Sequence, residues 1–144
     1  LITMAEWKLA DSAQIAIQYF TNAIKVDSNQ ASYYFKRAKA NKLFGEFEKA
    51  QFDLHKAFGL DSNEADYANE LAYFYFQFEM WDKAKTYYNK SYVLSDGRDA
   101  DALYGKAMSE IKLKENEEAI ASLESLLLLN PNDAEIITKL DSLR

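Results

Sequence analysis

The chain has 144 residues, of which 49% are hydrophobic and 15% aromatic, enough to bury the core of one globular domain. It has no Cys, which excludes disulfides, thiolate nucleophiles and cysteine metal sites, and one Pro and four Gly leave room for long helices. The net charge of −6, without a basic segment, disfavours nucleic acid as a partner.

Four alanines mark an internal repeat. Ala16, Ala50, Ala84 and Ala119 are 34, 34 and 35 residues apart, and each is followed four residues later by a bulky side chain. Twelve residues before each alanine is another apolar residue, an alanine in the last three copies. A 34-residue period with apolar positions at helical spacing predicts one pair of antiparallel helices, A and B, per repeat. We expect the A-helix and B-helix alanines to meet, because only a small side chain fits where two helices cross closely.

In chain order, the register predicts a truncated repeat, three complete repeats and a capping helix, at 1–30, 31–64, 65–99, 100–133 and 134–144. In the first complete repeat, helix A is expected at 32–44 and helix B at 47–59. The turns between repeats contain the sequences DSN, SDG and NPND, which are typical of helix ends. About nine helices are expected in all, and Asp133 or Asn132 would cap the last one.

This pattern resembles the tetratricopeptide repeat over essentially the whole chain. The first half of the motif is degenerate, with Tyr34, Arg37-Ala38 and Asn41 in the places of Trp, Leu-Gly and Tyr. The second half is well kept, and Pro131 in LLLLNPND is in its usual place. The resemblance implies an all-α fold, a right-handed α-α superhelix (solenoid) of helix-turn-helix repeats with a C-terminal capping helix, as a single domain over 1–144.

The resemblance also implies a protein-interaction module that binds a peptide or protein segment in a concave groove lined by the A helices. Aromatic and Met side chains with charged neighbours suit such recognition. The groove residues expected by position are Phe35, Lys36, Lys39, Asn69, Glu70, Tyr73, Tyr104 and Met108. The competing interpretation is structural, because an aromatic stripe at helical spacing is more often part of a core than of a binding site.

One ligand class can be tested by position. Tetratricopeptide domains that bind acidic chaperone tails use a clamp of Lys, Asn, Asn, Lys and Arg. Starting in the second repeat, the corresponding positions are Phe35, Lys39, Glu70, Asp101 and Gly105. An acidic residue where a cation should meet a carboxylate would repel that ligand. The sequence therefore argues against a chaperone-tail clamp.

Catalysis has little support in the sequence. The single histidine, His55, lies beside no Ser or Cys at a recognisable motif spacing, and a solvated surface residue is the expected state. We therefore expect no enzyme activity, no metal site and no cofactor.

The alternative function is a structural or self-associating segment of a longer repeat protein. A weak homo-oligomer could form through an apolar N-terminal edge near Leu1, Ile2 and Leu9. The longest apolar runs, at 71–76 and 126–129, are too short to insert across a membrane. The chain begins LITMAEW without an initiator Met, so we expect a fragment; its compartment is left open, with the cytoplasm slightly favoured.

Overall fold

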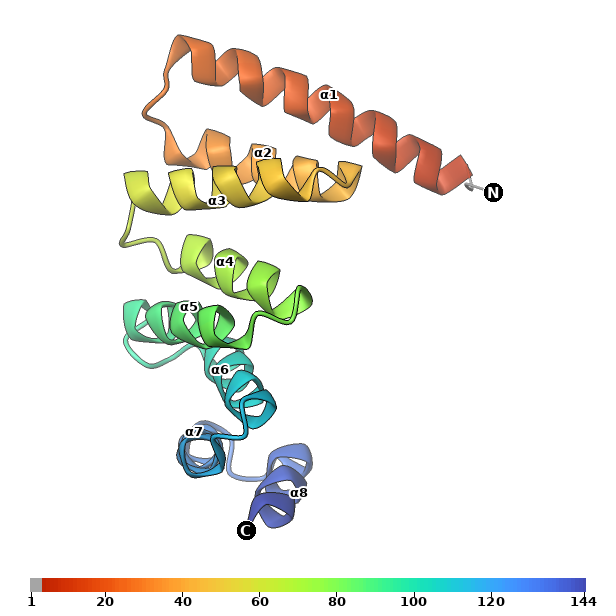
Figure 1. Cartoon of the computed structure of the whole chain (residues 1–144). Coiled ribbons are helices and arrows are strands. Elements are labelled where there is room, and N and C mark those ends of the chain that lie inside the picture. The colour runs from red at the N-terminus through yellow and green to blue at the C-terminus, as the bar shows by residue number, and fades with distance from the viewer. Residues whose placement is uncertain (1–3) are drawn as a thin grey trace. The chain divides into compact units, whose positions relative to one another are not determined.

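The computed structural model describes residues 4–144, and the side chains of residues 10–144. All regular elements in this part are α-helices, labelled in Figure 1. They are α1 (Met4–Val26), α2 (Ala31–Phe44), α3 (Phe47–Leu60), α4 (Ala65–Gln77), α5 (Trp81–Leu94), α6 (Ala100–Lys112), α7 (Asn116–Leu129) and α8 (Ala134–Leu143). The helices group into two compact units, Leu1–Asn63 and Glu64–Arg144. The predicted all-α fold of successive helix pairs is confirmed.

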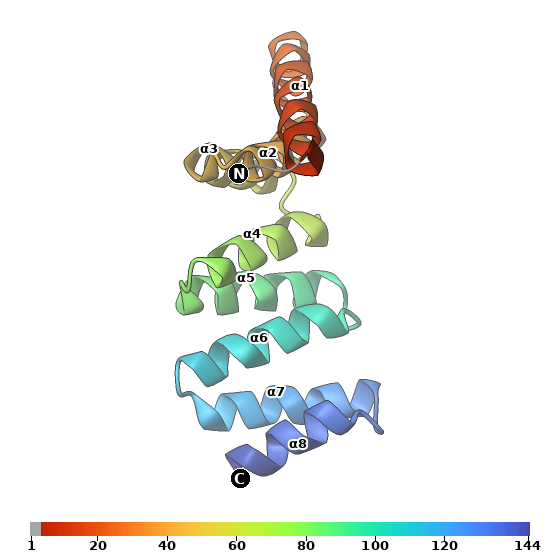
Figure 2. The ribbon, with the colours of Figure 1, turned by 90° about the vertical axis from the view of Figure 1, so that its right-hand side faces the viewer.

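Within the units, α2 packs on α3, α4 on α5 and α6 on α7. Figure 2 shows α4 to α8 of the second unit stacked in chain order. The alanines at these crossings have no exposed surface: Ala38, Ala50, Ala72, Ala84, Ala107 and Ala119 are all 0% exposed. The predicted role of alanine as the spacer between crossing helices is therefore confirmed for the three complete repeats.

The turns explain why short motifs recur along the chain. In both DSN turns the Asp side chain accepts a hydrogen bond from the backbone N–H two residues later, at 3.1 Å for Asp27 and 3.3 Å for Asp61. The turn inside each complete repeat contains one residue with positive φ, namely Gly45 (86°), Glu79 (58°) and Lys114 (62°). Each lies five residues before a B-helix alanine, so the sharp turn between helices A and B occurs at a fixed place.

The first repeat differs from the prediction. The register placed parts of two helices in residues 1–30, but α1 continues through Asp11, the place where the other repeats turn (Figure 1). The described part of the chain therefore has eight helices rather than about nine. A left-handed turn at a residue other than glycine costs about 1–2 kcal/mol. In α1 no packed pair offsets that cost, and the good helix formers Ala10 and Ala13 favour continuation.

The last helix closes the second unit as predicted. Asp133 caps α8, because its Oδ1 accepts the N–H groups of Glu135 at 3.1 Å and Ile136 at 3.3 Å. Ile136 and Leu140 are buried in a cluster with Leu103, Leu123 and other residues of α6 and α7. None of the helices in residues 4–144 is both long enough and apolar enough to cross a membrane. The predicted edge at Leu1, Ile2 and Leu9 lies outside the residues whose side chains are described.

Candidate functional site

The predicted site residues of the first unit all lie on α2. Lys36 and Lys39 are exposed, and Phe35 is half-buried. The Lys39 ammonium nitrogen lies 4.5 Å from the centre of the Phe35 ring, a cation–π contact. These three residues therefore form a small basic patch with an aromatic base.

The other five predicted residues lie on two neighbouring helices of the second unit. Asn69, Glu70 and Tyr73 are on α4, and Tyr104 and Met108 are on α6, which contacts α4. Spacings of three and four residues place each set on one side of its helix. Tyr73 is 47% exposed and the other four are half-buried. We call these five residues the A-helix face of the second unit; their role in binding stays a prediction.

A sixth residue near this face was not predicted from the sequence. Tyr88 of α5 is 7% exposed, and its ring packs on the backbone of Gly105 in α6, where a Cβ atom would lie 2.5 Å from Tyr88 Cζ. Burial is the main cause, with smaller contributions from Tyr73 and the Glu70 carboxylate, and together they raise the pKa of Tyr88 to about 12. Tyr88 therefore forms part of the floor beneath the A-helix face. A signal was available, since the equivalent residues of the neighbouring repeats are Leu54 and Leu123.

A cavity of about 390 Å³ lies beside this face, between α6, α7 and α8. It is lined by Ala100, Asp101, Tyr104, Leu126, Asn130, Asp133, Glu135 and Ile136. The Tyr104 hydroxyl donates a hydrogen bond of 2.7 Å to Glu135 Oε1. Burial, this hydrogen bond and the nearby negative charge of Glu135 and Asp133 raise the pKa of Tyr104 to about 12. The phenol is therefore neutral and oriented over most of the pH range.

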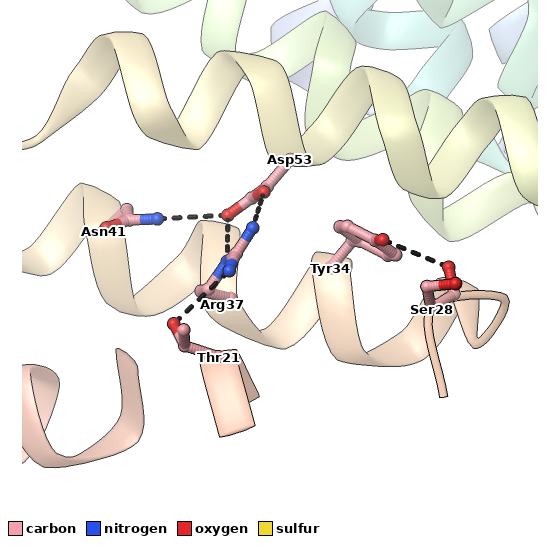
Figure 3. Close-up of polar contacts among 6 residues, drawn as sticks. All are labelled: Thr21, Ser28, Tyr34, Arg37, Asn41 and Asp53. Carbon is pink, nitrogen blue, oxygen red and sulfur yellow. Dashed lines mark hydrogen bonds and ion pairs between the residues drawn. The ribbon is translucent and has the colours of Figure 1, made fainter. Parts of the chain in front are cut away.

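The first unit contains a buried ion pair that the sequence analysis missed. Figure 3 shows Arg37 of α2 against Asp53 of α3, with Nη2–Oδ1 and Nε–Oδ2 distances of 2.7 and 2.8 Å. Asn41 Nδ2 donates to the same carboxylate at 3.1 Å, and Arg37 Nη1 reaches Thr21 Oγ1 of α1 at 3.3 Å. Asp53 is 1% exposed, and its hydrogen bonds raise the pKa of Arg37 above its ordinary value.

These contacts connect three helices of the first unit, α2 to α3 through the Asp53 carboxylate and α1 to α2 through the Arg37 guanidinium. A cavity of about 390 Å³ borders them, lined by Ile17, Thr21, Arg37, Asn41, Glu48, Lys49, Phe52 and Asp53. The Asp53 oxygens already accept three hydrogen bonds, and the guanidinium is engaged on all three nitrogens. We therefore interpret this cluster as a structural link between α1, α2 and α3.

Comparison with known proteins agrees with the repeat register. The model of the family described as "Tetratricopeptide repeat" matches residues 100–133, the bounds predicted for the fourth repeat. The crystal structure of MamA aligns with 99% of this chain and 84% of its own, with a TM-score of 0.81 and 19% identity. Residues 100–133 therefore match a tetratricopeptide repeat, and the chain has the fold of tetratricopeptide repeat structures.

Two other tetratricopeptide structures are similar to it. YrrB, described as a protein "with an unusual peptide-binding site", is 27% identical with a TM-score of 0.72, over 86% of this chain and 63% of its own. The second tetratricopeptide domain of human RPAP3, in complex with the HSP70 peptide SGPTIEEVD, is 21% identical with a TM-score of 0.65, over 76% of this chain and 91% of its own. No curated protein sequence matches the chain significantly.

Proposed function

We propose that this protein is a non-enzymatic interaction module that binds a polypeptide segment on its A helices. The observation that carries the proposal is that Tyr73 on α4 is half-exposed and that Tyr104 and Met108 lie on the adjoining helix α6 of the second unit. Such side chains supply large contact areas that adapt to a helix or an extended strand. Structures of the same fold bind peptides, as the descriptions of YrrB and RPAP3 state.

The test compares peptide capture by the wild type with that by a Tyr73→Ala, Tyr104→Ala double variant. We expect the double variant to lose most of the captured peptides, because truncating a central aromatic residue costs about 2 kcal/mol or more at an interface. The matched control is Tyr19→Ala with Phe52→Ala. It removes two aromatic rings of α1 and α3, outside the A-helix face of the second unit, that are 67% and 64% exposed. Unchanged capture by the first variant would contradict the assignment of this face.

Self-association is the second candidate, and α1 provides the observation in its favour. Ile15 and Tyr19 lie four residues apart on α1, and both are 67% exposed. α1 packs on α2, but in the described part of the chain it has no preceding A helix, whereas each B helix of the complete repeats packs on the A helix before it. Light scattering across micromolar concentrations would detect an oligomer, and a strict monomer throughout would rule this candidate out.

A further inference from the structure

Negative charge is concentrated in the second unit. Residues 64–144 contain sixteen Asp or Glu and nine Lys or Arg, a net charge of −7, whereas residues 1–63 contain seven and eight, a net charge of +1. Both units use the same helix pairs, so the fold itself does not require the excess of acid. Where the carboxylates lie therefore bears on what the second unit binds.

The N-terminal ends of the A helices carry many of these carboxylates. Asp66 lies in the first turn of α4, Asp101 in the first turn of α6 and Glu135 in the first turn of α8, and all three are exposed. Glu70 follows one turn after Asp66. Lys112, near the C-terminal end of α6, lies over the Trp81 ring at 5.6 Å from its centre. The acidic character is therefore strongest at one end of the A helices.

The cavity between α6, α7 and α8 combines this acidic rim with an apolar floor. Leu126 and Ile136, on the floor, are 6% and 4% exposed. Asp101, Asp133 and Glu135 line the same cavity. A Lys or Arg side chain has the matching composition, because its methylene groups cover apolar surface while its charged end group meets carboxylates or water.

A metal ion fits this rim less well than an organic cation. Nowhere in the described part of the chain do three or more His, Cys, Asp or Glu side chains gather closely enough to hold a metal. One oxygen of Glu135 accepts from Tyr104, and one oxygen of Asp133 accepts two backbone N–H groups, so each carboxylate is already oriented. Acids in a first helical turn also stabilise the helix, but that role does not require three of them around one cavity.

We propose that the A-helix face of the second unit binds a basic segment of a partner protein. A Lys or Arg side chain enters the cavity between α6, α7 and α8, and a neighbouring apolar residue packs on Tyr73 and Met108. This inference rests on the proposed function and adds the chemistry of the partner. An acidic segment such as the EEVD end of the RPAP3 ligand would meet like charge here.

The experiment uses a library of random 12-residue peptides displayed on phage and selected on the whole chain. We expect the captured sequences to be enriched in Lys and Arg, with apolar residues nearby. A captured basic peptide should bind about five to ten times more weakly to an Asp101→Asn, Glu135→Gln double variant, which removes two charges and leaves the α8 cap in place. Replacing its Lys and Arg by Gln should have a similar effect.

The matched control is Glu117→Gln with Asp141→Asn, which removes the same charge from exposed positions on α7 and α8 outside the cavity. Its affinity should stay within about twofold of the wild type, and circular dichroism should show both variants folded. Capture without basic enrichment, or equal affinity of the two double variants, would overturn this inference and leave the proposed function standing. If the wild type captured no peptide at all, both would be overturned.

Discussion

Two helix crossings occupy the same place in the repeat, but different polar side chains meet there. In the first unit, α2 and α3 meet through Asn41 and Asp53, with Arg37 completing a charged cluster. In the second unit, α6 and α7 meet at the corresponding positions through Glu110 and Ser122, whose Oγ donates to Glu110 Oε1 at 2.6 Å. The comparison indicates that the register sets where the helices touch, and that the polar side chains at each crossing pair with different partners.

The middle repeat offers a third solution at the same positions. Tyr75 and Tyr87 stack there with ring centres 5.8 Å apart and planes at 17°. Lys83 and Lys90 lie over these two rings, each at 5.2 Å from the nearer ring centre. Three kinds of contact therefore serve one crossing, because its geometry is determined by the buried alanines nearby and not by this pair.

The largest effect is expected at the charged crossing. Asp53→Ala leaves the Arg37 guanidinium partly buried without its carboxylate, which should cost the first unit about 3 kcal/mol. Amide hydrogen exchange measured by mass spectrometry should speed up in α1, α2 and α3 and stay unchanged in α6 and α7. The control is Glu124→Gln, which breaks an ion pair with Arg144 of the same 2.7 Å length but with both side chains 54% exposed. Glu124→Gln should cost under about 1 kcal/mol. An equal loss of stability in the two variants would contradict the claim that the buried ion pair matters more than the exposed one.

A smaller loss of stability is expected at the crossing of α6 and α7. Ser122→Ala removes the donor to Glu110, which is 3% exposed, and should destabilise the second unit by about 1–3 kcal/mol. Hydrogen exchange should then speed up in α6 and α7 and not in α2 and α3. An increase in hydrogen exchange spread evenly over both units would show that each crossing does not stabilise its own unit alone.

The same Gly→Ala substitution should destabilise the second unit at Gly105 and stabilise the first unit at Gly59. At Gly105 a Cβ atom would lie 2.5 Å from the Tyr88 ring, so we expect a loss of about 1–3 kcal/mol from overpacking. At Gly59 of α3 nothing lies within 4 Å, and alanine should stabilise the helix by about 0.4–1 kcal/mol. Urea unfolding followed by circular dichroism measures both. Adding Tyr88→Leu to Gly105→Ala should recover much of the loss; no recovery would contradict the packing explanation.

The stability of the second unit is expected to decline gradually at alkaline pH. The pKa values of Tyr88 and Tyr104 are raised to about 12, above their ordinary value near 10. Their contribution to the stability of the second unit is therefore complete below about pH 10 and is lost as the pH rises towards 12. Urea unfolding between pH 8 and pH 12 should show this decline, and Tyr104→Phe should make it shallower. An unchanged slope would mean that Tyr104 titrates normally.

Sequence reasoning predicted the regular parts of the fold. The bounds of α2 and α3 agree with the prediction to within one residue, because the alanine register and the turn residues both point to the same places. It failed at α1, where the same register continues but no packed pair offsets the cost of the turn at Asp11. A period in the sequence shows where a turn can form and not whether tertiary contacts stabilise it.

The site was only partly predictable for a related reason. Position in the repeat was enough to bring Tyr73 and Tyr104 onto neighbouring helices. The register could have placed Tyr88 in the floor of the site, but it could not reveal that its ring lies against Gly105, because that contact joins side chain and backbone of different repeats. The pairing of Arg37 with Asp53 was missed likewise, since a lone acidic residue on an apolar helix side does not identify its partner sixteen residues away.

The most direct test of the account is to map a captured peptide on the chain by NMR. Amide shifts of the wild type would be recorded as the peptide is added. The account predicts the largest changes at the A-helix face of the second unit, around residues 69–73 of α4 and 104–108 of α6. Largest changes on the outer sides of α5 and α7, with α4 and α6 unaffected, would contradict it.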